Sequence, residues 1–220
     1  MSATALVIVG AGGHAVSVTN VALSCGFDVI AYVDDAKAGT RLMDVPVIDQ
    51  QECLRLYARY SLFVAIGDNA LRERVSLEYK QDFPNAHFPS LIHPSSVIGA
   101  ASKVAEGVVV MPLVNVGPNS DIGNFCILNS SSSVDHDSVL HDFASLAPGS
   151  ICGGSVNIGT RSVISIGAVV KHGVNIGADT VIGAKSYVHR SIGNNVIAYG
   201  TPCKKIRNRK TGERLSLIHI

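Results

Sequence analysis

The chain has 220 residues, of which 47% are hydrophobic and 16% are charged, and its formal net charge is +1. This composition is typical of a globular protein with one or two domains. The near-neutral charge excludes a general nucleic-acid-binding or membrane-surface role, because both usually need a strongly basic field.

We expect no targeting segment at the start of the chain. Residues 1–10 have no cationic segment before their apolar run, and no stretch reaches the roughly 20 apolar residues that span a bilayer. The five cysteines have no CxxC or metal-finger spacing, and their number is odd. We therefore expect a cytoplasmic protein with free thiols and without a disulfide framework.

Strands and helices alternate over the first ninety residues. An apolar run at 5–9 is typical of a strand, and the amphipathic segment after it ends near Cys25 and Gly26, as a helix with a glycine stop does. Further strands are expected at 29–33 and 62–66. This order, followed by a helix over 71–79, predicts parallel βαβ packing with about three strands.

A glycine-rich turn follows the first strand. Gly10-x-Gly12-x-x-Ala15 fits the dinucleotide-binding fingerprint, and the acidic pair Asp34-Asp35 follows about 20 residues later. Glycines in such a turn let backbone N–H groups approach phosphate oxygens at a helix N-terminus. A complete dinucleotide fold needs two such halves, so we favour half of a Rossmann fold with one mononucleotide-sized site. A tight strand–helix turn without a ligand is the alternative.

The predicted nucleotide-binding residues stand at the C-terminal ends of neighbouring strands, where ligands bind in open α/β sheets. They are Gly12, Gly13, His14, Asp34, Asp35, Gly67 and Asn69.

From Ile98 to Val188 the chain has an aliphatic residue at every sixth position, with Cys152 as the exception. A small residue often stands two places before it, and a glycine often follows it. An α-helix cannot keep every sixth residue on one face, because it repeats every 3.6 residues. The pattern predicts a parallel β-helix, in which three hexapeptides make one coil. We expect an α/β domain over 1–94, the β-helix over 95–200 and a basic tail over 201–220.

The most charged part of the β-helix segment is Asp135-His136-Asp137, which falls at a corner turn and is expected to point outward. Flanking carboxylates favour the imidazolium, which suits His136 to accept a proton as a general base. Gly154 follows one coil later, roughly 4.8 Å away, where its N–H could stabilise an oxyanion. A polar corner residue without a catalytic role is the alternative for His136.

The same spacing argues against a metal site within one chain. His172 stands two coils from His136, about 9–10 Å away, and His141 stands at a different phase of the repeat. These separations are too large for a shared ligand shell. A site across a subunit boundary stays open.

Six motifs in this order resemble the nucleotide-sugar acetyltransferases of the left-handed β-helix, hexapeptide-repeat class. The resemblance is to the branch of sialic-acid O-acetyltransferase-like and bacillosamine or perosamine N-acetyltransferases, and it covers nearly the whole chain. The motifs are Val9-Gly10-Ala11-Gly12-Gly13-His14-Ala15, Val64-Ala65-Ile66-Gly67-Asp68-Asn69, Ile92-His93-Pro94, Val134-Asp135-His136-Asp137, Ala147-Pro148-Gly149 and Gly200-Thr201-Pro202. The resemblance implies a left-handed β-helix, a homotrimer, and acetyl-CoA in the groove between neighbouring subunits, without a metal.

The resemblance also implies roles for individual residues. His136 corresponds to the catalytic base, Asp137 to the acidic residue beside it, and Gly154 to the N–H that faces the thioester carbonyl. Ile166 and Ala184 match backbone contacts to the coenzyme.

Two further features follow from the resemblance. Lys185 and the basic stretch 204–210 are candidates to meet the CoA phosphates, with a solvated tail as the alternative for the stretch. Many relatives carry a second histidine where this chain has Ser145. A hydroxyl or a water must replace that imidazole here, or the acceptor differs.

We therefore expect an acetyl-CoA-dependent N-acetyltransferase with His136 as general base. The expected acceptor is the amino group of a nucleotide-linked 4-amino-4,6-dideoxy sugar, with UDP as the expected nucleotide. The alternatives are O-acetylation of a sugar hydroxyl, as in sialic-acid O-acetylation, and a non-catalytic scaffold. NAD-dependent redox chemistry is the weakest alternative, because no second nucleotide half is apparent.

Overall fold

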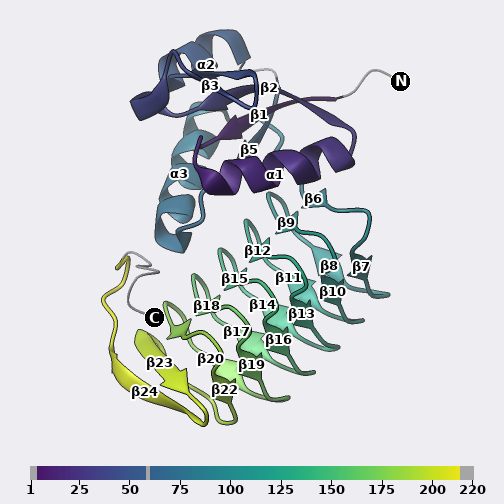
Figure 1. The fold of residues 1–220 in the computed structure, drawn as a ribbon, viewed down its shortest axis with the longest axis vertical. Coiled ribbons are helices and arrows are strands. Elements are labelled where there is room, and N and C mark those ends of the chain that lie inside the picture. The colour runs from purple at the N-terminus through teal and green to yellow at the C-terminus, as the bar shows by residue number, and fades with distance from the viewer. Residues whose placement is uncertain (1–3, 58–59, 214–220) are drawn as a thin grey trace.

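The N-terminal α/β domain lies on one end of a long parallel β-helix (Figure 1). The structure is a computed structural model, and it describes residues 4–57 and 60–213. None of the helices in these two ranges is long and apolar enough to cross a membrane.

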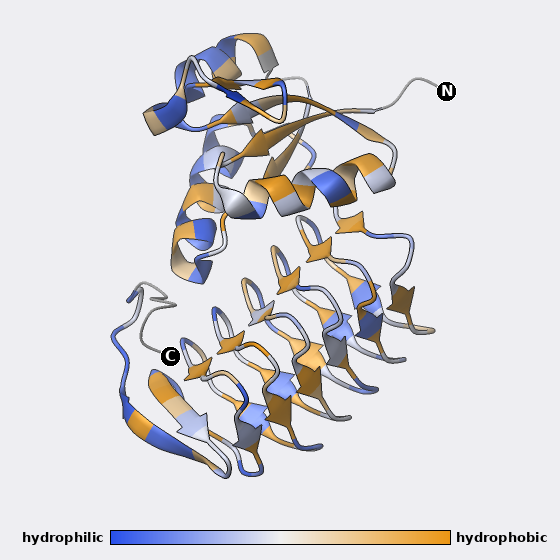
Figure 2. Cartoon of the chain, viewed as in Figure 1, coloured by the Kyte–Doolittle hydropathy of each residue, from blue (hydrophilic) through white to orange (hydrophobic). Residues whose placement is uncertain are grey.

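The sheet of the N-terminal domain has the strand order β3-β4-β2-β1-β5. Its elements are β1 (Thr4–Val9), α1 (Gly13–Ser24), β2 (Phe27–Val33), η1 (Asp35–Lys37), β3 (Arg41–Leu42), β4 (Val45–Ile48), α2 (Gln50–Tyr57), β5 (Ser61–Val64) and α3 (Asn69–Asp82). All pairs are parallel except β3 with β4. Figure 2 shows that the central strands are apolar, and Leu6, Ile8 and Leu62 are fully buried.

The expectation of about three strands was wrong, because β3 and β4 add two. β3 has only two residues, too few for a sequence pattern. β4 contains Pro46, and a proline argues against a strand because it removes a ladder donor. β4 tolerates it because only the short β3 pairs with it on that side.

Three parallel sheets form the faces of the β-helix, and each strand pairs with the strand one coil later. The β7–β22 sheet contains β7 (Val97–Ile98), β10 (Asn115–Val116), β13 (Ser133–Val134), β16 (Ile151–Cys152), β19 (Val169–Val170) and β22 (Tyr187–Val188). The β8–β20 sheet contains β8 (Lys103–Val104), β11 (Asp121–Ile122), β14 (Val139–Leu140), β17 (Asn157–Ile158) and β20 (Asn175–Ile176). The β6–β21 sheet contains β6 (Leu91–Ile92), β9 (Val109–Val110), β12 (Ile127–Leu128), β15 (Ser145–Leu146), β18 (Val163–Ile164) and β21 (Val181–Ile182).

The predicted aliphatic column fills the interior of this prism. Val116 pairs with Val134, and Val134 pairs with Cys152, at the 18-residue spacing of one coil. These three side chains are at most 1% exposed. The first strand, β6, begins at Leu91, before the β-helix boundary expected at residue 95.

The small residues before the aliphatic column build a ladder of hydroxyl groups between coils. The Oγ of Ser102 accepts a hydrogen bond from the amide of Ser120, the Oγ of Ser120 from that of Ser138, and the Oγ of Ser138 from that of Val156. The glycines that follow the aliphatic residues are required for a different reason. A Cβ on Gly117 would lie 2.5 Å from the backbone nitrogen of His136, so only glycine allows the next coil to approach.

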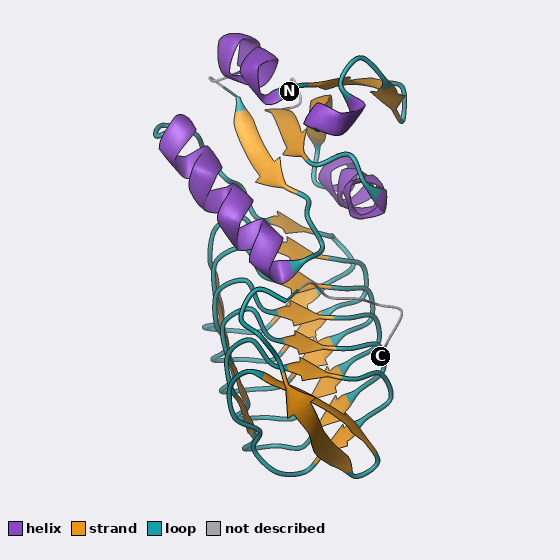
Figure 3. Ribbon diagram, turned by 90° about the vertical axis from the view of Figure 1, so that its left-hand side faces the viewer, coloured by secondary structure: helices purple, strands orange, loops and turns teal. Residues whose placement is uncertain are grey.

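α3 fixes the N-terminal domain against the β-helix at the corner between the β8–β20 and β6–β21 sheets (Figure 3). We call this edge the Phe125 corner, which comprises Phe125, Phe143, Arg161 and Asp179. The rings of Phe125 and Phe143 stack with centroids 5.5 Å apart. Arg161 donates to Glu73 of α3 at 2.8 Å and to Asp179 at 2.6 Å. The ion pair between Arg161 and Glu73 therefore joins the two domains, whereas the stacked rings both belong to the β-helix.

A hairpin closes the far end of the β-helix. β23 (Val196–Gly200) extends the β6–β21 sheet, and β24 (Cys203–Asn208) pairs antiparallel with it. The expected tail is therefore partly a strand, and its residues 214–220 lie outside the described residues. All five cysteines are free thiols, as predicted.

Candidate active site

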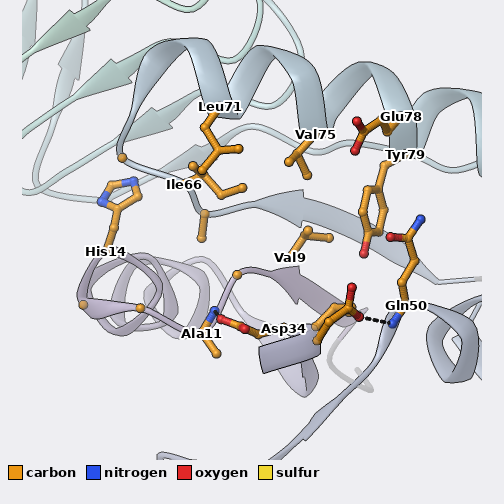
Figure 4. Close-up of a pocket in the computed structure, with 17 residues that line it drawn as sticks. Val9, Ala11, His14, Asp34, Gln50, Ile66, Leu71, Val75, Glu78 and Tyr79 are labelled. Atoms are coloured by element: carbon orange, nitrogen blue, oxygen red, sulfur yellow. Dashed lines mark hydrogen bonds between the residues drawn. The ribbon is translucent and has the colours of Figure 1, made fainter. Parts of the chain in front are cut away.

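A cavity of about 520 Å³ opens at the carboxyl ends of β1, β2 and β5 (Figure 4). We call it the nucleotide cavity. Six of the seven residues predicted to bind a nucleotide line it, and these are Gly12, Gly13, His14, Asp34, Asp35 and Gly67. The pattern at the strand ends therefore identified one continuous cavity.

The beginning of α1 borders the nucleotide cavity and suits an anion. Gly12 stands at the N-cap and has no side chain to cap the helix, and the first turn contains no acidic residue. The amides of Gly13 and His14 thus remain for a ligand such as a phosphate, whereas that of Ala15 donates to the carbonyl of Gly12. Gly10 has a φ of +105°, and a Cβ there would lie 3.1 Å from the carbonyl oxygen of Ala65, so the turn requires glycine.

The acidic pair holds the loops around the nucleotide cavity. Asp34 Oδ2 accepts a hydrogen bond from the amide of Ala11 at 3.2 Å, and Asp35 Oδ1 accepts one from the amide of Gln50 at 2.9 Å. Leu71 and Tyr79 of α3 form the opposite wall (Figure 4). The sequence alone does not predict this wall, because the residues of α3 follow the polar pattern of an exposed helix.

A second cavity, of about 340 Å³, lies between the N-terminal domain and the β-helix. We call it the junction cavity. His14 and Gly67 line both cavities, so the two are adjacent. The floor of the junction cavity is mainly apolar and includes Ile127 and Val163, with Ser145 between them.

His14 is half-buried and lies between the two cavities. Its Nε2 atom is buried without a hydrogen-bond partner. Burial, and then the positive charge of Arg72, lower the pKa of His14 to about 4. His14 is therefore neutral at pH 7, and its Nε2 makes no hydrogen bond within the protein.

Asn69, which was predicted to bind the nucleotide, does not lie with the other predicted residues, because its side chain lines neither cavity. It is 1% exposed, and its Nδ2 donates to the carbonyls of Arg161 and Ser162. Its Oδ1 accepts from Ser145 Oγ at 2.7 Å and from Arg72 at 2.8 Å. Asn69 therefore fixes the domain junction.

His136 points outward from the corner between the β7–β22 and β8–β20 sheets, as predicted. We call this edge the His136 corner, which comprises His136 and Gly154. The Nδ1–H of His136 donates to Asp137 Oδ2 at 2.7 Å, and the side chain is 53% exposed. This hydrogen bond, followed by the charge of Asp135, raises the pKa of His136. Nε2 is left as the proton acceptor and lies beside Gly154.

The predicted coenzyme-binding residues lie along a different edge. Ile166, Ala184 and Lys185 stand at the corner between the β6–β21 and β7–β22 sheets, which we call the Ile166 corner. All three are exposed, and Ile166 also lines the junction cavity. Within one chain the structure therefore divides the predicted site into two groups, with the β7–β22 sheet between them.

In residues 4–57 and 60–213, no group of three His, Cys, Asp or Glu side chains is placed to hold a metal ion.

Comparison with known proteins places both parts of the chain in one class. Residues 5–79 match the family model described as the PglD N-terminal domain. The chain is 30% identical over 195 residues to a GDP-perosamine N-acetyltransferase of Escherichia coli O157:H7, covering 85% of this chain and 87% of that protein.

Two solved structures share the whole architecture. One is a mutant of perosamine N-acetyltransferase from Caulobacter crescentus in complex with CoA and GDP-perosamine, with 37% identity and a TM-score of 0.87, covering 93% of this chain and 97% of that chain. The other is the acetyltransferase domain of PglB from Neisseria gonorrhoeae, with 27% identity and a TM-score of 0.85, covering 92% and 99%.

The fold and the two cavities thus define an acyltransferase of the hexapeptide-repeat class, with acetyl-CoA as its co-substrate. The chain belongs to the nucleotide-sugar acetyltransferases of this class, the family predicted from its six motifs. It is an acetyl-CoA-dependent N-acetyltransferase, as predicted, which sets aside the scaffold alternative. The solved structures also confirm the expected fold class, an α/β domain followed by a parallel β-helix.

Proposed function

We propose that this enzyme transfers an acetyl group from acetyl-CoA to the amino group of a GDP-linked 4-amino-4,6-dideoxy sugar. The relatives that support this proposal are the perosamine N-acetyltransferases, one of which was solved with CoA and GDP-perosamine. We expected UDP from the sequence and now propose GDP, because the nucleotide named for these relatives is GDP. Their chemistry also favours nitrogen over oxygen as the acceptor.

One observation carries the mechanism, namely the imidazole of His136 beside the backbone of Gly154 with Asp137 on its Nδ1. The sugar nitrogen attacks the thioester carbon while His136 Nε2 accepts a proton from the amine. The Gly154 N–H stabilises the oxyanion of the tetrahedral intermediate. The new C–N bond remains when the C–S bond breaks, and the CoA sulfur leaves as thiolate and takes the proton from the imidazolium.

The two groups of site residues meet in a proposed homotrimer. The outward side chains of the β7–β22 sheet are apolar and exposed at Val97 (58%), Ile151 (50%), Val169 (37%) and Tyr187 (39%). The β8–β20 sheet instead presents polar groups such as Lys103 and Asp121. Three prisms with their β7–β22 sheets around one axis bring the His136 corner of each chain beside the Ile166 corner of the next.

The groove between these two corners fits acetyl-CoA. Ile166 offers an apolar contact for the pantetheine chain, and the ammonium group of Lys185 lies along the same edge above Gly167. Lys204 and Lys205 of β24 are exposed near the end of this groove and supply positive charge for the CoA phosphates.

A cytoplasmic location stays a prediction.

The test is an acetylation assay with acetyl-CoA and GDP-, UDP- and dTDP-linked 4-amino-4,6-dideoxy sugars, with the products analysed by mass spectrometry. We expect a gain of one acetyl group on the nitrogen of the GDP-linked sugar. Turnover of a UDP- or dTDP-linked sugar at a higher kcat/KM would refute the proposed nucleotide, and an O-acetyl product would refute the proposed acceptor.

A further inference from the structure

Arg72 is the largest fully buried side chain of the described residues, and its six hydrogen bonds all reach uncharged oxygen atoms. Its Nε and Nη2 donate to the carbonyls of Phe125 (2.8 Å) and Phe143 (2.9 Å) on the β-helix. Its Nη1 donates to the carbonyls of Ile66 (2.9 Å) and Gly67 (3.2 Å) in the β5–α3 turn. A guanidinium buried among neutral acceptors is costly.

Arg72 does more than join the two domains, because it also contacts residues on both sides of the junction cavity. Nη2 also donates to Ser145 Oγ at 3.2 Å. Gly67 belongs to the wall that the N-terminal domain contributes to the junction cavity, and Ser145 belongs to the floor that the β-helix contributes. One guanidinium thus sets the spacing between two opposite surfaces of this cavity.

Ser145 itself does not replace the imidazole that many relatives have at this position. Its hydroxyl proton is used in the hydrogen bond to Asn69 Oδ1, and it accepts from Arg72. The smaller side chain leaves space, and the remaining floor around it is apolar.

We propose that Arg72 is a positioning residue that shapes the junction cavity to receive the sugar ring of the nucleotide-linked acceptor. This inference rests on the proposed function. The diphosphate lies at the start of α1 in the nucleotide cavity, and the sugar passes His14 and Gly67 into the junction cavity. The apolar floor faces the deoxy carbon of the sugar, while His14 presents an uncharged imidazole to its hydroxyl groups.

Calorimetric titration of the complete enzyme with GDP and with GDP-perosamine, in the absence of CoA, tests this role. Lysine keeps the positive charge but cannot form all the hydrogen bonds of the guanidinium group. Arg72→Lys should therefore weaken GDP-perosamine binding about tenfold, which corresponds to a loss of roughly 1.4 kcal/mol. GDP binding should remain within twofold. In the assay, KM for the sugar nucleotide should rise while KM for acetyl-CoA stays unchanged.

Two further variants make the test decisive. Ser145→Val changes the floor without removing Arg72, and it should also weaken GDP-perosamine more than GDP, which covers the case that the Arg72 variant does not fold. Arg161→Gln is the matched control, because it breaks the ion pair with Glu73 at the same junction without lining the junction cavity. It should bind both ligands like the wild type.

Two results would overturn the inference. One is an equal loss of GDP and GDP-perosamine affinity in the Arg72 and Ser145 variants, and the other is the same selective loss in the Arg161 variant. Failure of the proposed function is a separate outcome, because the wild-type enzyme would then acetylate no GDP-linked amino sugar.

Discussion

The imidazole of His136 and the backbone of Gly154 lie so close across one coil that a Cβ on Gly154 would be 2.6 Å from Nε2. This contact joins a proton acceptor to a backbone N–H on the next coil. It exists because residues 18 apart stack in register, as Val134 and Cys152 do just before them.

Replacing His136 with alanine removes the proposed general base. We expect kcat to fall by about 10² or more, in line with the usual contribution of such a group, while the thermal midpoint stays within a few degrees because the side chain is exposed. The control is His141→Ala, since His141 hydrogen-bonds Asn157 on the β8–β20 sheet, away from the proposed groove. Near wild-type turnover in the His136 variant would remove the mechanism.

The variant Asp137→Asn tests how the base is tuned. The hydrogen bond to Asp137 raises the pKa of His136, and only the neutral imidazole accepts a proton. Its loss lowers that pKa, so the acidic limb of the kcat/KM profile should move to lower pH while the maximum rate decreases. The kcat/KM profile is measured from pH 5 to 9. An acidic limb that stays in place or moves to higher pH contradicts the proposal that Asp137 raises the pKa of the general base His136.

A methyl group at Gly154 should displace the imidazole without unfolding the protein. Gly154→Ala places a Cβ against Nε2, so we expect a loss of about 10² in kcat with an unchanged circular dichroism spectrum. Gly193→Ala is the matched control, because a Cβ at Gly193 meets nothing within 4 Å. Equal losses in both variants would point to a general effect on the β-helix.

The half-buried His14 should make stability depend on pH. Its folded-state pKa of about 4 lies below the ordinary value of 6.5, so the unfolded chain binds more protons between these values. The contribution of the neutral ring to the free energy of unfolding is complete above pH 6.5. As the pH falls toward 4, this contribution is lost, by up to about 3 kcal/mol.

Thermal midpoints of the wild type and of His14→Asn at pH 7.5 and pH 5 measure this effect. The wild type should lose more stability than the variant on acidification, because other groups titrate alike in both proteins. The same loss in both proteins would contradict the assignment to His14.

The proposed trimer makes a specific prediction for the β7–β22 sheet. Ile151→Asp places a charge in the apolar face, so we expect smaller particles by light scattering and a loss of at least tenfold in kcat/KM, because each site needs two chains. Val139→Asp on the β8–β20 sheet is the control and should stay trimeric. A monomeric wild-type enzyme with full activity would refute the composite site.

The candidate site was predictable where it follows from the repeat or from a turn. The spacing of 18 placed His136 beside Gly154, and the glycine turn with Asp34 and Asp35 located the nucleotide cavity. Arg72 was not predictable. The buried face of α3 consists of Asn69, Arg72, Ser76 and Tyr79, which is the polar pattern of an exposed helix.

The sequence by itself determined the coil, because a six-residue period of aliphatic side chains can be buried only when successive turns stack at fixed spacing. That stacking also determined which corner residues are neighbours. Tertiary structure alone decided how α3 docks on the Phe125 corner, and therefore that Arg72 and Asn69 line the junction between domains instead of facing water. The physical reason is that these hydrogen bonds link residues 53 to 93 positions apart, which no local pattern encodes.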